Sequence, residues 1–182
     1  MNASRIVRFG IAAVVLGALI GLMIVALNLA GQKGNRPTVG STAPDFSLTL
    51  YEGYRADLPE TVRLSDLRGK VVVINFWGSW CPECHVEAED LQRVYEKYRT
   101  RDVVFLGVDY LDTEAEAYRY LARYAITYAN GLDIQQKIST AYRITAAPET
   151  FIIDRNGMVA DVIIGGTNES ALSQRIETVL AK

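Results

Sequence analysis

The stretch Lys70–Glu87, KVVVINFWGSWCPECHVE, contains both cysteines of the chain, and only Pro82 and Glu83 separate them. It opens with a nearly continuous apolar run rich in β-branched residues, which is typical of a strand buried on both faces. A helix is predicted from about Pro82 to Arg99, because proline fits best at the first helical position. The two cysteines are therefore expected where a buried strand passes into a helix.

That location favours a reactive dithiol. Cys81 is expected at the N-terminus of the helix, where unpaired backbone N–H groups and the helix dipole stabilise a thiolate. The thiolate is the nucleophile in disulfide exchange. Cys84 lies about one turn further on, close enough to close a small disulfide and release a bound partner. A CxxC pair between a strand and a helix indicates a redox centre.

Other roles for the cysteine pair have less support. A structural disulfide closing so short a loop contributes little stability. A zinc site needs four ligands, but the chain offers two cysteines and one histidine, His85, which we expect to face solvent. A Cu(I) site from two thiolates and a histidine stays open as an alternative, because soft ligands select Cu(I). A peroxide-reducing thiol needs Pro and Thr just before the cysteine, and WGSW has neither. We therefore predict no cofactor and no resident metal.

The remaining pattern predicts an α/β domain. Strands are expected within 45–53, near 61–64 and over 102–110, and a hairpin over 149–164 with its turn at Asp154–Gly157. Helices are expected over 113–126, 134–144 and 168–180, with Thr113 and Asn168 as caps. This order of elements indicates a mixed central sheet with helices on both faces.

The N-terminus differs from the rest of the chain. No charged side chain occurs between Arg8 and Lys33, so residues 9–30 can form one transmembrane helix. Because positive flanks tend to stay in the cytoplasm, Arg5 and Arg8 predict a cytoplasmic segment 1–8 and a C-terminal domain outside. A cleaved signal peptide is the competing interpretation, although no good cleavage site follows the apolar run. Residues 31–44 are expected to form a flexible linker, and residues 45–182 the domain.

Composition narrows the function classes. The 182 residues carry a formal net charge of −2, so no electrostatic footprint for nucleic acid is present. About half of the residues are hydrophobic, which argues against wholesale disorder. The expected partners are a protein substrate and, through the N-terminal helix, a lipid bilayer.

The segments VVVINFWGSWCPEC (71–84) and AAPETFIIDRNG (146–157), together with Glu87, resemble the membrane-anchored, extracytoplasmic thioredoxin-like proteins of the TlpA, ResA and CcmG group. The resemblance covers Val39 to Leu180. It implies a thioredoxin-like fold and thiol-disulfide oxidoreductase activity at a bacterial cell membrane. Several members of the group reduce the disulfide of apocytochrome c for haem attachment, and others serve copper-centre assembly. The resemblance also implies a membrane electron donor of the CcdA or DsbD type.

The resemblance assigns roles to individual residues. Cys81 matches the attacking thiol and Cys84 the resolving thiol. Pro148 matches a cis-proline beside the disulfide, which leaves the backbone at Ala147 free to pair with a substrate strand. Tyr110, in the strand-end sequence DYLD, is either a substrate contact or an ordinary loop residue. The positions expected to bind substrate are Trp80, Pro82, Ala147 and Pro148.

Two acidic residues are expected to tune the dithiol. Glu87 matches an acid that adjusts the site in this group. General thioredoxins carry a buried Asp where this chain has Asn75, so Glu87 is the better candidate to exchange a proton with Cys84. Glu83 lies between the cysteines, and nearby negative charge raises a thiol pKa. A destabilised thiolate makes the reduced form less favourable, so we predict that the protein is a reductant.

Overall fold

The computed structural model describes residues 16–23 and 35–182. Residues 16–23 are helical, and a separate compact unit runs from Arg36 to Lys182. The predicted segment 1–8 and most of the predicted span 9–30 lie outside the described residues. Within 16–23 and 35–182, no helix combines the length and the apolar character needed to cross a membrane.

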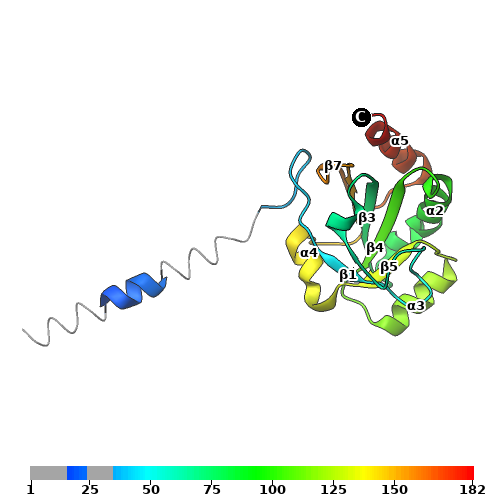
Figure 1. The fold of residues 1–182 in the computed structure, drawn as a ribbon. Coiled ribbons are helices and arrows are strands. Elements are labelled where there is room, and N and C mark those ends of the chain that lie inside the picture. The colour runs from blue at the N-terminus through cyan, green and yellow to red at the C-terminus, as the bar shows by residue number, and fades with distance from the viewer. Residues whose placement is uncertain (1–15, 24–34) are drawn as a thin grey trace, which may run out of the picture. The chain divides into compact units, whose positions relative to one another are not determined.

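A mixed sheet of five strands forms the centre of the compact unit, in the order β5-β4-β3-β6-β7 (Figure 1). The strands are β3 (Val71–Trp77), β4 (Val103–Asp109), β5 (Ala129–Leu132), β6 (Glu149–Ile153) and β7 (Val159–Ile164). Neighbours are parallel from β3 to β5, and antiparallel between β3 and β6 and between β6 and β7. All seven residues of the central strand β3 are buried, which confirms the prediction made from its apolar run.

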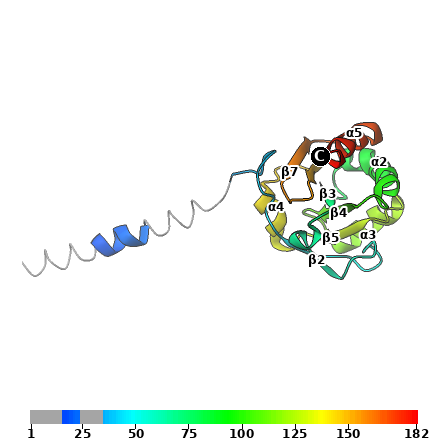
Figure 2. The ribbon, with the colours of Figure 1, turned by 45° about the horizontal axis from the view of Figure 1, so that its top comes forward.

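Helices cover both faces of the sheet. They are α2 (Pro82–Tyr98), α3 (Glu114–Arg123), α4 (Lys137–Tyr142) and α5 (Glu169–Leu180). Residues of α2, α3 and α5 share one core with Val73, Phe105 and Ile152 of the sheet. Residues of α4 share the core on the other face with Ile74, Leu106 and Phe151. Figure 2 shows α4 across the sheet from α2 and α5. The predicted mixed α/β architecture is confirmed.

A small two-stranded sheet completes the second face. It consists of β1 (Ser47–Thr49) and β2 (Thr61–Arg63), which are antiparallel, followed by the 3₁₀ turn η1 (Leu64–Leu67). The alternation of exposed and buried residues in both strands buries Leu48 and Val62. These side chains join the core under α4.

Local signals located most of the helix starts. The Thr113 hydroxyl accepts a hydrogen bond from Glu116 N at 3.3 Å and caps α3.

The helix expected over 134–144 is instead divided into the 3₁₀ turn η2 (Ile134–Gln136) and α4. Gln135 and Gln136 have positive φ angles of 59° and 55°, a left-handed conformation that interrupts a right-handed helix.

Strand β5 was not predicted. Its sequence, ANGL, contains no β-branched or aromatic residue, so the usual strand signal is missing. The strand pairs in parallel with β4 and lies close to the β1 segment: a Cβ atom at Gly131 would lie 2.2 Å from the carbonyl oxygen of Thr49. Gly131 also forms an isolated bridge with Leu50. Long-range packing, rather than local propensity, therefore sets this strand.

The compact unit begins earlier than the expected domain boundary at Asp45. Residues 36–44, expected in the linker, belong to it. Gly40 N donates to Val159 O at 2.8 Å, and Ala43 N donates to Gly157 O at 3.0 Å. Arg36 forms an ion pair with the buried carboxylate of Glu149, the residue directly after Pro148. These contacts fasten the start of the domain to the β6–β7 hairpin.

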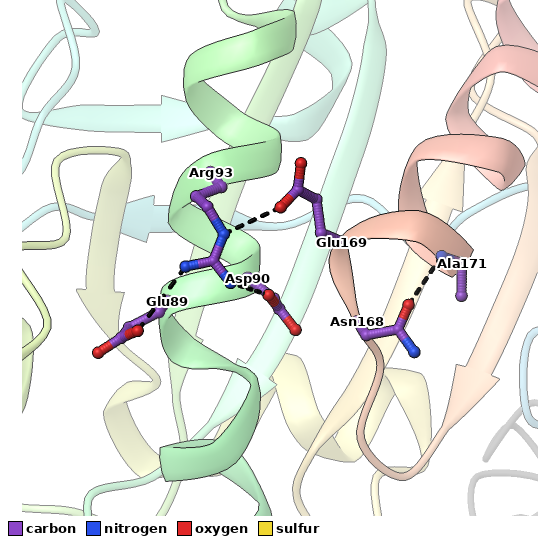
Figure 3. Close-up of polar contacts among 6 residues, drawn as sticks. All are labelled: Glu89, Asp90, Arg93, Asn168, Glu169 and Ala171. Carbon is purple, nitrogen blue, oxygen red and sulfur yellow. Dashed lines mark hydrogen bonds and ion pairs between the residues drawn. The ribbon is translucent and has the colours of Figure 1, made fainter.

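Helices α2 and α5 are joined by polar contacts at their surface (Figure 3). Arg93 Nε donates to Glu169 Oε2 at 2.9 Å, and Arg93 also pairs with Glu89 and Asp90 of its own helix. Asn168 Oδ1 accepts from Ala171 N at 3.0 Å, which confirms Asn168 as the cap of α5. Exposed ion pairs contribute little each, so the cap is the stronger local determinant.

We predict that Asn168→Ala lowers the free energy of unfolding of residues 36–182 by about 1 kcal/mol, because the first turn of α5 loses an acceptor for a backbone N–H. Urea unfolding measures the effect. Asn168→Asp, which keeps an acceptor at the cap, serves as the control and should stay close to the wild type. Equal losses for the two variants would show that the capping contact is not the cause.

We also predict that Arg36→Ala costs about 1–3 kcal/mol of unfolding free energy, because it leaves the Glu149 carboxylate buried without its cation. Glu149 has 2% side-chain exposure and Arg36 has 29%, so the cost falls below that of a fully buried pair. Adding Glu149→Gln should recover part of the loss. Arg55→Ala, at an exposed pair, is the matched control and should cost less than about 0.5 kcal/mol. An Arg36→Ala variant as stable as this control would contradict the prediction.

Candidate active site

The two cysteines are joined by a disulfide at the point where β3 passes into α2. Cys81 is the N-cap of α2 and Pro82 its first residue, as the sequence predicted. The Cys81 sulfur accepts a hydrogen bond from Cys84 N at 3.1 Å. Cys81 has 2% exposure and Cys84 has none. Any surface that the disulfide offers to a partner therefore belongs to Cys81.

The loop before β6 lies against the same core. The Ala147–Pro148 peptide bond is cis, as expected. Ala147 is half-buried and packs on the cluster that contains both cysteines. Pro148 is buried, and its carbonyl oxygen accepts from Gly165 N at 3.0 Å. The two residues before Ala147 are exposed, so this loop leads from the surface to the region of the disulfide.

Glu87 is buried one turn after Cys84, with 1% exposure. Its Oε1 accepts from Asn75 Nδ2 at 3.0 Å, and its Oε2 accepts from Thr167 N at 2.9 Å. Burial raises the pKa of Glu87 from 4.5 to about 7, although both hydrogen bonds oppose the shift. The carboxyl can therefore take up or release a proton near neutral pH.

Asn75 connects this carboxyl to strand β6. Its amide nitrogen also donates to Thr150 Oγ1 at 3.0 Å, while its own Oδ1 is buried without a partner. Turning the amide over would direct the oxygen at Glu87 and Thr150, both of which could then donate to it. The network can thus hold Glu87 with or without its proton.

Glu83 behaves differently from Glu87. It is exposed on the first turn of α2, where water screens its charge. Its negative charge adds to the upward shift in the pKa of Glu87. Of the two acids between Cys81 and the second turn of α2, only Glu87 is buried.

Trp80 and Tyr110 lie together beside the redox pair. Their ring centroids are 6.2 Å apart, and Trp80 Nε1 donates to Tyr110 O at 3.0 Å. Trp80 is 49% exposed. Tyr110 also lines a pocket of about 240 Å³ with Arg143, Ile144 and Thr145, on the segment that leads to Pro148. Tyr110 is therefore a neighbour of the active-site loop, whereas Pro82 is simply exposed at the helix start.

The expectation that His85 faces solvent is wrong. The side chain is half-buried, and both ring nitrogens are engaged: Nε2 with Ser79 O and Nδ1 with the Tyr124 hydroxyl, each at 2.8 Å. The ring also packs edge-on against Tyr120. Position next to Cys84 on a helix suggested exposure, but α3 covers this side of α2 through its tyrosines.

A second buried acid was missed by the sequence analysis. Asp109, at the end of β4, has no exposure, and its Oδ2 accepts from the Tyr51 hydroxyl at 2.6 Å. Its Oδ1 has no partner. Burial raises the pKa of Asp109 from 3.8 to about 7. Asp109 is the register partner of Trp77, so it lies at the same end of the sheet as the dithiol.

The copper alternative finds no prepared site in the part of the chain that the structure describes. No group of three or more His, Cys, Asp and Glu side chains is arranged there to hold a metal ion. Both nitrogens of His85 are used by other partners. A Cu(I) site made of the two sulfurs and His85 would have to break one of these contacts.

Comparison with known proteins gives the family. A model described as the AhpC/TSA family matches residues 39–162, which is more than half of the 182 residues. The chain belongs to the AhpC/TSA family. Its curated relatives in this family include proteins named thiol-disulfide oxidoreductases. The chain is a thiol-disulfide oxidoreductase, and its CxxC pair is Cys81 and Cys84.

Two of these relatives cover most of the chain. The thiol-disulfide oxidoreductase ResA of Geobacillus kaustophilus is 35% identical over 78% of this chain and 78% of its own length. The thiol:disulfide interchange protein DsbE of Allochromatium vinosum is 31% identical over 91% of this chain and 88% of its own length. The resemblance stated from the sequence is confirmed by both.

Solved structures agree with the fold. A putative thiol:disulfide interchange protein DsbE from Chlorobium tepidum superposes with a TM-score of 0.70 at 28% identity, covering 79% of this chain and 99% of that one. A putative thioredoxin from Neisseria meningitidis gives 0.68 at 26% identity, covering 78% of this chain and 92% of that one. The prediction of a thioredoxin-like fold for the compact unit is confirmed.

The raised pKa of Glu87 predicts a pH-dependent stability. The folded carboxyl keeps its proton up to about pH 7, and the unfolded one releases it near 4.5. Between these values the folded state binds more protons, so the free energy of unfolding falls as the pH rises, by about 3 kcal/mol at most from this group. Asp109, whose pKa is raised as well, contributes with the same sign.

Glu87→Gln should therefore make the free energy of unfolding of the oxidised protein fall less steeply as the pH rises. Relative to the wild type, the variant should gain stability between pH 5 and pH 8, and urea unfolding at intervals of one pH unit measures it. Glu83→Gln, at an exposed position on the same helix, should leave the slope unchanged. If Glu87→Gln kept the full wild-type slope, Glu87 would not titrate in this range.

Proposed function

We propose that this protein is a membrane-tethered, extracytoplasmic reductant of protein disulfides, with apocytochrome c as the leading substrate. The observation that carries the proposal is the buried Glu87 carboxyl one turn after Cys84, with a pKa of about 7. A proton acceptor in that range suits the resolving step of dithiol chemistry near neutral pH. The relatives, a thiol-disulfide oxidoreductase and a thiol:disulfide interchange protein, support thiol-disulfide exchange as the reaction.

The reaction begins with the reduced protein. The Cys81 thiolate attacks one sulfur of the substrate disulfide, so that a mixed disulfide forms and one substrate thiolate leaves. Cys84 then gives its proton to the Glu87 carboxylate, and its sulfur attacks the Cys81 sulfur. The second substrate thiolate leaves, and the Cys81–Cys84 disulfide remains. Two electrons have passed from the protein to the substrate.

The substrate approaches along the exposed residues around the redox pair. Trp80 and Pro82 flank Cys81 and are exposed. The backbone at Ala147 is available to an extended substrate segment, which would pair with it as an added strand. Tyr110, in contact with Trp80, extends this surface toward the pocket beside Thr145.

The acids around the dithiol favour the reducing direction. An ionised carboxylate near a thiol disfavours the thiolate, and a less stable reduced form gives up electrons more readily. A reductant working outside the cytoplasm must be resupplied with electrons, because that compartment is oxidising. A membrane carrier of the CcdA or DsbD type fits this need, with the predicted N-terminal anchor keeping the domain at the bilayer.

The reduction potential tests the direction. We expect a value near or below that of thioredoxin, about −270 mV, when the protein is equilibrated with a dithiol buffer. A value near about −120 mV, as in a strong oxidase, would overturn the proposal. Cys84→Ala should trap mixed disulfides with the substrate, whereas Cys81→Ala, the matched control, should trap none. Trapped apocytochrome c would support the leading substrate, and a trapped copper-assembly protein would favour the alternative.

A further inference from the structure

His85, the single histidine of the chain, touches neither sulfur through its ring nitrogens, yet it is built into the active-site loop. Nε2 lies 2.8 Å from Ser79 O. A carbonyl oxygen only accepts, so Nε2 carries the hydrogen. In the neutral ring Nδ1 then accepts from the Tyr124 hydroxyl, also 2.8 Å away. The imidazole therefore bridges the loop before Cys81 and the end of α3.

The backbone N–H of Ser79 is held as well. Ser79 N donates to Asp112 Oδ2 at 2.6 Å. Both backbone polar groups of Ser79 are thus bound by side chains from outside the loop, one on α2 and one on the segment after β4. Asp112 is itself fixed, because its Oδ1 accepts from Thr113 N at 2.8 Å. A loop residue with both its N–H and its C=O bound in this way has little freedom to move.

Ser79 lies two residues before Cys81, and the chain between them is tightly turned. Cys81 N donates to Gly78 O at 3.1 Å, and Trp80 is bound to Tyr110 O through its indole nitrogen. A displacement of Ser79 would therefore move Cys81 away from the helix start, where Cys84 N donates to its sulfur. That contact and the helix dipole are what stabilise a thiolate at Cys81.

We propose that His85 is a positioning residue of the redox centre, which together with Tyr124 and Asp112 clamps Ser79 and so keeps the Cys81 sulfur at the N-terminus of α2. His85 acts through the backbone, not by contact with the reacting sulfurs. The inference depends on the dithiol being redox-active, and it holds whichever way the electrons run. A reduction potential that overturned the proposed direction would leave it intact.

The test uses the full-length protein in a Cys84→Ala background, where Cys81 is the single thiol. The rate of Cys81 alkylation by iodoacetamide is measured from pH 5 to pH 9. We expect His85→Leu to shift the half-maximal pH upward by about one unit and to slow alkylation at pH 6 by about threefold to tenfold, since less thiolate is present. Val86→Ala, at the exposed neighbouring position, is the matched control and should leave the profile unchanged.

Two further variants separate positioning from loss of fold. His85→Gln keeps a donor that can reach Ser79 O and should restore part of the rate. Tyr124→Phe keeps the ring but removes the hydroxyl, and should give a smaller upward shift that disappears in the His85→Leu background. The proposal is overturned if His85→Leu leaves the pH profile unchanged, or if the effects of Tyr124→Phe and His85→Leu simply add. Should His85→Leu not fold, Tyr124→Phe alone decides: a wild-type profile rejects the clamp.

Discussion

Burial of the Glu87 carboxyl is the constraint around which the redox end of the molecule is arranged. A carboxyl group out of water needs donors, and each of its oxygens receives one, from Asn75 on β3 and from the backbone of Thr167 before α5. The side chain therefore joins the central strand, the active-site helix and the loop into the last helix. Asn75 extends the connection to Thr150 on β6, two residues after Pro148. The element that carries the dithiol and the strand that follows the Pro148 loop share one hydrogen-bond network.

The sequence was most informative where local physical rules decide the structure. A fully apolar run with β-branched residues became the buried strand β3, Thr113 and Asn168 became helix caps, and Pro82 marked the start of α2. The chemistry of the site was predictable for the same reason, because a cysteine at a helix start is a local feature. Resemblance to a known group added the cis bond at Pro148, which no periodicity could have indicated.

What the sequence did not predict depends on contacts between distant residues. The ion pair of Arg36 and Glu149 spans 113 positions, and residues 36–44 belong to the compact unit. Strand β5 pairs with β4, and its Gly131 leaves room for the backbone of Thr49. His85, expected to face solvent, is half-buried, and its Nδ1 contacts the Tyr124 hydroxyl after α3. Helical periodicity gives a stripe on one element but not the identity of the element that covers it.

The direction of electron flow depends on how strongly the protein stabilises the Cys81 thiolate. Potentials of about −270 mV and about −120 mV differ by about 7 kcal/mol, at 1.4 kcal/mol for each 30 mV. A helix N-terminus contributes about 0.3–1 kcal/mol to a thiolate, and about 2 kcal/mol in the best partly buried geometry. The imidazole of His85, next to Cys84, uses both nitrogens for hydrogen bonds with Ser79 and Tyr124 and donates none to a sulfur. An ionised carboxylate at Glu87, one turn after Cys84, would disfavour a thiolate there. The stabilising contribution at Cys81 is therefore smaller than the difference of about 7 kcal/mol, and this supports the reducing direction proposed above.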